Sequence, residues 1–327
     1  MPRAGERGVI LLSALILMAL AAVVAAAMFF DTGLAARRAA TAFAMEEAMQ
    51  LGQGAEALAA YALSQDTNQT DTPQDAWAQP TDPLQAAPDT VLLAQLYDLQ
   101  GRFNINTLVS VTTTSTTNPT ANLKYSRNEN AYKVFTRLLA LLQIDPSLAD
   151  EVVDWIDPDV TPQPQGGEDS LYMSMDPPHL TANIAVTSTS ELMQLPGFTR
   201  DVYLKLQPHI TALPPSVRTI NVCMADGFVL DALYAVTKDS SHSEYSLLTP
   251  QQLLGQRGGD CFPSQQSLLN EADASSRTAL RQMTTQRTNW FQLQTVVRIG
   301  TAEFDLYSLM YRNGRTARAV ARTVGTE

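Results

Sequence analysis

The hydrophobic residues of this 327-residue chain begin as one unbroken run. After the polar residues 1–8, the apolar run 9–30 contains no charge, and the next charged side chain is Asp31. A helix over 9–30, at about 1.5 Å per residue, is about 33 Å long and crosses a membrane once. The next segment, 31–65, is rich in alanine with scattered large apolar residues, a composition that favours helix. Anchor and stalk are therefore predicted to form one long helix.

Further along, apolar residues recur at the three- and four-residue spacing of amphipathic helices. This spacing runs through 132–142 and again through 148–156. Side chains that typically cap helices precede later apolar segments: Ser188 with Glu191, Asp226, and Thr249 with Gln252. The middle of the chain is therefore predicted to be a helical block over 130–285.

Strand-like segments flank that block on both sides. Apolar and polar residues alternate through 97–106 and again through 291–299, which is typical of half-buried strands. Asn313 and Gly314 then stand between two further strand-like segments. A two-residue turn of this type predicts a β-hairpin.

Two segments show neither the helical nor the strand-like spacing of apolar residues. Asp, Thr, Gln and Pro dominate 66–89, and the threonine-rich run 110–120 has no bulk to bury, so we expect two loops, the second of them mobile. Together the elements predict an α+β fold, in which a long amino-terminal helix and an antiparallel sheet are joined to a large all-helical insertion. The expected parts are the sheet segments 66–129 and 286–327 and the insertion over 130–285.

Composition and charge narrow the function. The chain is 45% hydrophobic and has 33 acidic against 22 basic residues, a formal net charge of -11. This balance argues against a general affinity for nucleic-acid phosphates. No zinc-protease motif, nucleophile elbow or phosphate-binding glycine loop is present in the sequence, so we expect no enzyme activity. Arg315, Arg318 and Arg322 fit either an anion-binding ribbon or charges that keep an edge strand from pairing, and we favour the second.

The amino-terminal run is compatible with a cleaved signal peptide or a plain membrane anchor. The junction of Gly8 and Val9, however, stands before the apolar run and resembles the processing site of type IV prepilins and pseudopilins. The resemblance implies that prepilin peptidase removes the leader 1–8 and that Val9 becomes N-methylated. It also implies a periplasmic domain held by a single pass of 9–30 through inner-membrane lipid.

The fifth residue of such a mature chain is Ser13, where most pseudopilins carry a glutamate. In that family the glutamate neutralises the amino terminus of a neighbouring subunit inside a low-dielectric helix bundle, where an unpaired charge is costly. A subunit at the tip has no neighbour above it. In lacking this glutamate the chain resembles minor pseudopilin K, the general secretion pathway protein K of type II secretion systems. The alternative is a chance serine in a generic anchor.

The densest group of oxygen ligands lies at and after the end of 148–156. Such carboxylates repel one another unless water or a cation screens them, and calcium takes six to eight oxygens from flexible loops. From the residues alone, a solvated acidic loop and a calcium site fit equally well. The candidate ligands are Asp154, Asp157, Asp159, Glu168 and Asp169.

This acidic stretch also resembles the signature segment of minor pseudopilin K. The matching residues are Asp154, Trp155, Ile156 and Asp157, followed after a proline-rich loop by Gly166, Gly167, Glu168, Asp169 and Tyr172. The resemblance implies a structural calcium ion, a pilin-like sheet domain and a SAM-like insertion. The chain departs from the family pattern after Val222, so the resemblance does not predict the local turn there.

Cys223 and Cys261 are the two cysteines of the chain. In an oxidising periplasm two lone thiols are more often joined than free, although two buried thiols are the alternative. A bridge between them would close a loop of about 38 residues and contribute about 3–4 kcal/mol.

Two classes of function follow. The resemblance implies a tip subunit of the type II secretion pseudopilus, which starts or caps the fibre with minor pseudopilins I and J, contacts the other pseudopilins of the fibre and serves protein export. The alternative is a membrane-anchored protein that binds DNA in uptake, because 195–198 (LPGF) resembles the turn of a helix-hairpin-helix module. That turn normally continues to a second glycine, whereas Thr199 and Arg200 follow here.

Overall fold

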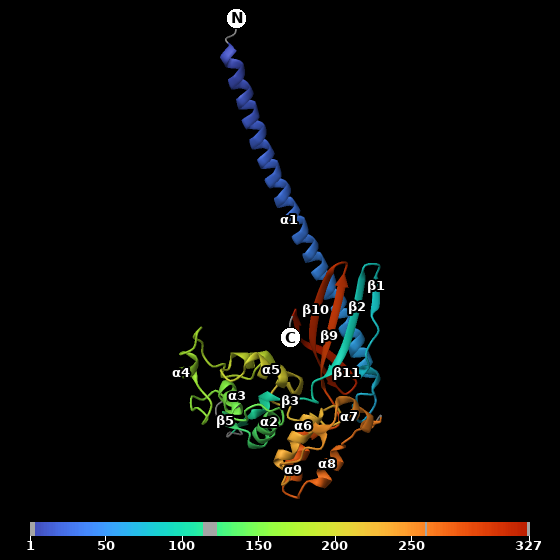
Figure 1. The fold of residues 1–327 in the computed structure, drawn as a ribbon. Helices are drawn as coiled ribbons and strands as arrows, with labels where there is room; N and C mark the ends of the chain where they lie inside the picture. Colours follow the sequence, from blue (N-terminus) through green and yellow to red (C-terminus); the bar gives the residue numbers. More distant parts are fainter. Residues whose placement is uncertain (1–3, 114–122, 259, 326–327) are drawn as a thin grey trace.

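A single helix leads into the folded body. The structure, a computed structural model, describes residues 4–113, 123–258 and 260–325. Helix α1 (Ala4–Gln65) extends from the amino terminus to the body without a break, as Figure 1 shows. The prediction of one helix for anchor and stalk is therefore confirmed. Its carboxyl-terminal part packs on the sheet, while its amino-terminal part stands free (Figure 1).

The sheet is antiparallel and has the order β1-β2-β9-β10-β11. Its strands are β1 (Leu84–Ala87), β2 (Thr90–Asp98), β9 (Trp290–Ile299), β10 (Ala302–Asn313) and β11 (Thr316–Val324). One face of the sheet packs against small residues of α1, among them Ala48, Ala55 and Ala59. Helix and sheet together bury Phe291 and Met310 completely. The predicted strand over 291–299 is confirmed.

The predicted hairpin joins β10 to β11. Gly314 sits in its turn with a φ of 61°, a left-handed conformation that glycine adopts without strain. A register shift between Leu309 and Met310 then leaves Val320 as an extra residue in β11. A bulge changes the face of the sheet to which the later residues of the strand point, and Arg322 therefore lies on the side of α1. Its guanidinium binds both carboxylate oxygens of Glu56 there, each at 2.6 Å.

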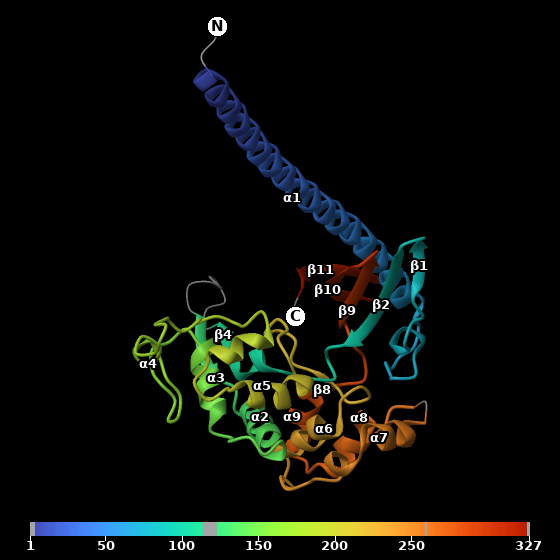
Figure 2. The same ribbon diagram turned by 45° about the horizontal axis from the view of Figure 1, so that its top comes forward.

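The helical insertion lies between two neighbouring strands. Asp98, the last residue of β2, is opposite Phe291 of β9, so residues 99–289 leave the sheet and return to it. Residues 99–129, predicted to belong to the sheet domain, therefore lie outside the five-stranded sheet. Figures 1 and 2 place the insertion at the end of the body away from the free part of α1.

The predicted helices of the insertion are present. Its α-helices are α2 (Glu129–Leu141), α3 (Leu148–Ile156), α4 (Asp169–Tyr172), α5 (Arg200–Leu206), α6 (Gly227–Leu233), α7 (Pro250–Arg257), α8 (Gln265–Glu271) and α9 (Ser276–Met283). Asp226 caps α6, and Thr249 with Gln252 forms a capping box before α7. The box of Ser188 and Glu191 starts a 3-10 helix rather than an α-helix. The 3-10 helices of the chain are η1 (Ala76–Ala78), η2 (Ile105–Leu108), η3 (Thr189–Gln194), η4 (Gln207–His209), η5 (Tyr234–Val236) and η6 (Tyr245–Leu247).

Short two-stranded ladders accompany the helices, so the insertion is helical but not all-helical. They pair β3 (Phe103–Asn104) with β6 (Ile210–Thr211), β4 (Val109–Thr113) with β5 (Leu123–Arg127), and β7 (Ile220–Asn221) with β8 (Thr284–Thr285). The start of the threonine-rich run is therefore a strand rather than a loop, and its residues 114–120 lie outside the described residues. The predicted loop over 66–89 includes η1 and β1.

The predicted strand over 97–106 is broken after Asp98: strand is present at 97–98 in β2 and again at Phe103–Asn104 in β3, but not at 99–102 or 105–106. The Asp98 carboxylate accepts hydrogen bonds from the amide of Gly101 and the hydroxyl of Thr288, and this turns the chain out of the sheet. The alternation then continues against a different partner, because Phe103 pairs in parallel with Ile210. A period of two reports the pleat of a strand and cannot identify the neighbouring strand.

Candidate functional site

Three acidic side chains meet at the end of α3. Asp154 lies in the last turns of α3, Asp157 is its C-cap, and Glu168 is the N-cap of α4. Each offers an oxygen within 4.8 Å of the oxygens of the other two, and all three side chains are buried. We call Asp154, Asp157 and Glu168 the carboxylate triad.

The loop that follows α3 folds back over the helix to complete the triad. Both carboxylate oxygens of Asp154 accept hydrogen bonds from the backbone amide of Gln163, at 3.1 and 2.9 Å. Asp150 accepts a hydrogen bond from the backbone amide of Gln165 at 3.1 Å. The loop passes so close to Asp154 that a Cβ on Gly166 would lie 2.0 Å from Oδ2 of that side chain. Glycine at this position is therefore required for the approach of the loop.

Burial and mutual repulsion disfavour three charges at this place. Burial, followed by the nearby charges of Asp157 and Asp150, raises the pKa of Asp154 to about 7. Burial and the charge of Asp159 raise the pKa of Asp157 to about 6. Burial, followed by the charge of Asp154, raises the pKa of Glu168 to about 7. The triad at neutral pH therefore requires protons or a cation to be stable.

The donor set of the triad fits a hard cation. Oδ1 of Asp157 and Oε1 of Glu168 are buried and have no hydrogen-bond partner among the described residues. Calcium binds carboxylate oxygens at about 2.3–2.6 Å, so oxygens within 4.8 Å of each other can share one ion. The described residues around the triad offer oxygens and no thiolate, and zinc prefers nitrogen and sulfur.

The structure separates the other two predicted ligands from the triad. Asp159 is exposed and accepts the amide of Thr161 at 2.8 Å. Asp169 uses Oδ1 to accept the amide and the hydroxyl of Thr181, at 3.0 and 2.6 Å, and these bonds lower its pKa. The five predicted ligands therefore reduce to three that lie together.

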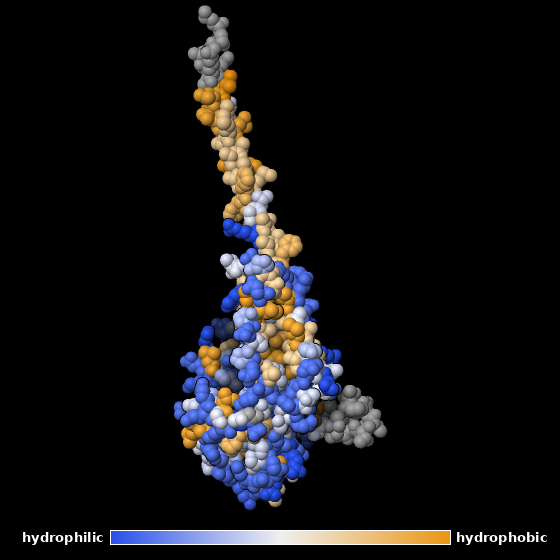
Figure 3. Space-filling view, turned by 90° about the vertical axis from the view of Figure 1, so that its right-hand side faces the viewer, coloured by the Kyte–Doolittle hydropathy of each residue, from blue (hydrophilic) through white to orange (hydrophobic). Residues whose placement is uncertain are grey.

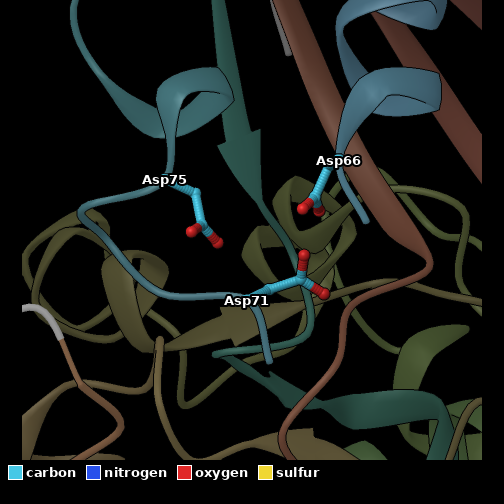
Figure 4. A group of neighbouring side chains, drawn as sticks. All are labelled: Asp66, Asp71 and Asp75. Carbon is cyan, nitrogen blue, oxygen red and sulfur yellow. The ribbon is translucent and has the colours of Figure 1, made fainter. Parts of the chain in front are cut away.

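A second acidic group, which the sequence analysis did not single out, surrounds a buried arginine. Figure 4 shows Asp66 and Asp71 turned toward each other after the end of α1, with Asp75 farther along the loop. The Arg312 guanidinium, 0% exposed, binds Oδ2 of Asp66 at 2.7 Å and also binds Asp71. The two aspartates stand about 240 residues from Arg312 in sequence, a separation no local pattern reports.

Arg312 affects the pKa values of the two aspartates that it binds. Arg312 and the amide of Asn68 outweigh burial and hold the pKa of Asp66 below its usual range, whereas complete burial raises that of Asp71. The carboxylate of Asp75 instead accepts hydrogen bonds from Nδ2 of Asn68 and from the backbone amide of Thr72. With a guanidinium already between its carboxylates, this group is a buried ion pair rather than a metal site.

The two cysteines are joined. Cys223, fully buried after β7, forms a disulfide with Cys261, which follows α7. The bridge closes a segment with a sequence separation of 38 residues. The predicted disulfide is confirmed, and the alternative of two free thiols is wrong.

The turn that resembles a DNA-binding module faces inward. Leu195 and Phe198 are each 2% exposed, and the amide of Gly197 donates to Oε2 of Glu151 at 2.9 Å. A carboxylate of the same chain therefore already binds the glycine amide of this turn. The interpretation of this turn as a DNA contact finds no support in the geometry.

The amino-terminal helix has the properties of a membrane anchor. Among the described residues, α1 is the helix whose length and composition allow a membrane crossing, and its most apolar part has a mean hydropathy of 2.8 and no burial within the chain. Ser13 lies in this part, and its hydroxyl donates to the carbonyl of Ile10 at 2.9 Å. The backbone of Gly8 and Val9 continues the same helix.

Comparisons with known proteins agree on one family. Residues 101–215 match the family model described as type II secretion system (T2SS), protein K. The chain is 27% identical over 335 residues to type II secretion system protein K of Pectobacterium carotovorum, covering 99% of this chain and 98% of that protein. It is 29% identical to the protein of the same name from Klebsiella pneumoniae, covering 98% and 97%. This chain belongs to the type II secretion system protein K family.

A solved member of the family has the same fold. The chain aligns with a TM-score of 0.67 and 23% identity to a chain in the crystal structure of the GspK-GspI-GspJ complex from the type 2 secretion system of enterotoxigenic Escherichia coli. The alignment covers 89% of this chain and 100% of that chain. Proteins of the K family are minor pseudopilins, structural components of a secretion system. The predicted α+β fold with a long apolar helix and a helical middle region is therefore confirmed.

Proposed function

We propose that this K-family chain is the tip subunit of a type II secretion pseudopilus, where it starts or caps the fibre. The observation that carries the proposal is the position of the insertion, which covers the end of the body away from the anchor helix (Figure 1). In a fibre whose subunits stand on parallel anchor helices, a body of this width blocks the place where a further subunit would add. Size alone makes the chain a terminal subunit.

Ser13 supports the same position. Within a bundle of membrane helices, a carboxylate at this place would neutralise the amino terminus of the subunit above. The Ser13 hydroxyl donates back to Ile10 of its own helix, so it is satisfied without a neighbour. A subunit with nothing above it loses no interaction by carrying serine there.

The partners we propose are minor pseudopilins I and J, together with the other pseudopilins of the fibre below. The support is the related chain that was crystallised with proteins of these names. We further propose that prepilin peptidase cleaves between Gly8 and Val9 and methylates Val9. The periplasmic domain would then be held in the inner membrane by residues 9–30.

A calcium ion in the carboxylate triad completes the proposal. Asp154, Asp157 and Glu168 would hold it, and its charge would remove the need for protons on three buried carboxyls. The ion would fix the loop after α3 onto the helix and has a structural role. The orphaned oxygens of Asp157 and Glu168 support this assignment.

The test removes the insertion and keeps the sheet. Since Asp98 and Phe291 are opposite each other in an antiparallel pair, an Asn-Gly turn in place of 99–290 closes β2 and β9 into a hairpin. A smaller deletion over 130–211 serves as a second variant. With pseudopilins I and J present, we expect both variants to stay anchored, to lose capping and to change the number and length of fibres. Fibres of unchanged number and length would contradict the proposal.

A further inference from the structure

Asp150 is a buried acid of the insertion that lies beside the carboxylate triad. Figure 3 shows a mostly hydrophilic surface on the lower part of the body, where water screens exposed acids. Asp150 is only 4% exposed, so its charge depends on partners within the chain. It stands on α3 four residues before Asp154, which places the two side chains on the same face of the helix.

Both carboxylate oxygens of Asp150 have partners within the chain. Oδ1 accepts a hydrogen bond from the hydroxyl of Tyr132 on α2, at 2.7 Å, and Oδ2 accepts one from the backbone amide of Gln165, at 3.1 Å. Burial, followed by the hydrogen bond to Asp150, raises the pKa of Tyr132 to about 12, so the phenol keeps its proton and remains a donor at neutral pH. Asp150 therefore ties α2 to the loop after α3.

Arg127, the last residue of β5, ties a second element to the same loop. Its Nη1 donates to Oε1 of Gln163 at 3.0 Å, and its Nε and Nη2 bind the two carboxylate oxygens of Glu129. The guanidinium lies 4.2 Å from the centre of the Tyr132 ring, a cation–π contact, and its Nη1 is 3.9 Å from Oδ1 of Asp150. Because these neighbours hold its planar guanidinium, Arg127 can fix the side chain of Gln163 in one place.

The path of the loop after α3 determines whether the triad is assembled. Helix α3 and its C-cap supply Asp154 and Asp157, whereas Glu168 reaches them only by way of this loop. The backbone amide of Gln163, whose side chain Arg127 binds, also donates to both oxygens of Asp154. A loop that is held in position before an ion arrives loses less conformational entropy when the ion binds. The bonds that hold this loop should therefore raise the affinity of the triad for a cation.

We propose that Asp150, Tyr132 and Arg127 are positioning residues for the cation of the carboxylate triad. They hold the loop that carries Glu168 on its ion-binding path and do not themselves bind the ion. Among the described residues, no hydrogen bond or ion pair joins Tyr132 or Arg127 to an oxygen of the triad. The proposal rests on the proposed function, since it explains the affinity of the calcium site proposed there.

Removal of one hydroxyl tests the contact to α2. Tyr132→Phe deletes the donor to Asp150 and keeps the ring that Arg127 contacts. Titration calorimetry of the full-length chain in detergent, with calcium chloride as the ligand, should give a Kd about tenfold higher than that of the unaltered chain, because partners that orient metal ligands commonly change the affinity by about this factor or more. The matched control is Tyr203→Phe, which deletes a hydroxyl on α5 that pairs with Thr189 and should leave the Kd unchanged.

An arginine variant tests the contact to β5. Arg127→Met deletes the donor to Gln163 and should also raise the Kd for calcium about tenfold. Its control is Arg137→Met, because Arg137 of α2 binds the backbone carbonyls of Ser241 and His242 instead. Amide hydrogen exchange gives a second measurement. Without calcium, the amide of Gln163 should exchange about tenfold faster in Arg127→Met than in the unaltered chain, and saturating calcium should restore its protection.

Comparison of Tm with and without calcium separates positioning from a purely structural role. A structural role lowers the Tm of a variant equally in both conditions and leaves the Kd unchanged, whereas a positioning role reduces the rise of Tm that a fixed calcium concentration produces. If the unaltered chain binds calcium and both Tyr132→Phe and Arg127→Met bind it with the same Kd, the positioning roles are wrong and the proposed function stands. If the unaltered chain binds no calcium, this inference fails together with the calcium site of the proposed function.

Discussion

In the sheet body, one continuous helix lies on one sheet, and small residues such as Ala48 and Ala55 let the two surfaces meet over Phe291 and Met310. In the insertion, short helices surround a separate core, and side-chain bonds hold the loops between them. The disulfide joins Cys223 to Cys261, and Asp154 holds the loop after α3. The body therefore depends on long regular elements, whereas the insertion depends on local cross-links.

The two regions also treat buried charge differently. The body buries Arg312 with Asp66 and Asp71, so positive and negative groups meet within the chain. The insertion buries Asp154, Asp157 and Glu168 together, and none of the ion pairs found in the described part of the chain includes these three side chains. The ion pair in the body needs no further ion, whereas the triad requires a cation from solution or protons. Calcium should therefore act on the insertion and leave the body unchanged.

The largest effect is expected from Arg312→Met. Removing the guanidinium leaves the buried carboxylates of Asp66 and Asp71 without a positively charged partner, which should lower the free energy of unfolding by about 3–5 kcal/mol. Chemical denaturation of the purified chain in detergent measures this loss. The control, Arg315→Met, changes an exposed residue and should alter the free energy of unfolding by less than about 0.5 kcal/mol. Equal effects of the two substitutions would show that the body does not depend on this ion pair.

The disulfide should rank next. Replacing both Cys223 and Cys261 by alanine removes a bridge over a sequence separation of 38 residues, and the free energy of unfolding should fall by about 3–4 kcal/mol. The unaltered chain treated with reductant should lose the same amount, and the double variant should not respond to reductant. A reductant that leaves the unaltered chain as stable as before would contradict the role of the bridge in the insertion.

Calcium should stabilise the insertion, and more so at high pH. The pKa values of Asp154 and Glu168 are raised to about 7, so folding favours their protonated forms. Without a cation, this stabilisation is present near pH 4 and is lost as the pH rises through about 7. Calcium at about 100 times its Kd should add about 2.7 kcal/mol at pH 8, and less at pH 5, where protons compete for the same oxygens.

Matched variants locate the calcium effect. Glu168→Gln should abolish the rise of Tm with calcium, because it removes a carboxylate of the triad. Asp169→Asn, at a residue that binds Thr181 instead, should keep the rise. A calcium response lost equally in both variants would show that the ion does not bind in the triad.

The smallest effect is a gain. Gly54→Ala places a methyl group where no atom lies within 4 Å, in the exposed interior of α1. The isolated chain should become more stable by about 0.5–1 kcal/mol, since alanine favours helix more than glycine does. Denaturation of the purified chain measures this gain. A loss of stability would show that the helix needs glycine at this position for its own packing on the body.

What the sequence predicts differs between the two regions for a physical reason. The anchor helix, the strand over 291–299 and the turn at Gly314 depend on local periodicity and local backbone preference, and all three are confirmed. The strand predicted over 97–106 leaves the sheet after Asp98 and resumes only at Phe103–Asn104, because the turn after Asp98 depends on Thr288, far away in sequence. The ion pair of Arg312 has the same long-range origin and no local signal.

The carboxylate triad lies between these cases. The density of acids after α3 identifies the segment, and three of the five candidates lie together. The choice among them depends on how the loop folds back, which the bonds of Gln163 to Asp154 and the close passage of Gly166 determine. Spacing along the chain does not report these contacts, so Asp159 and Asp169 were indistinguishable from true members of the triad.

The central claim is that residues 9–30 remain on the mature chain as the helix that anchors a pseudopilin. Mass spectrometry of the amino terminus, on the chain purified from membranes of cells with an active prepilin peptidase, tests it most directly. We expect a mature chain that begins with N-methylated Val9 and keeps the whole apolar run. An intact Met1, or a terminus located after Phe30, would contradict it.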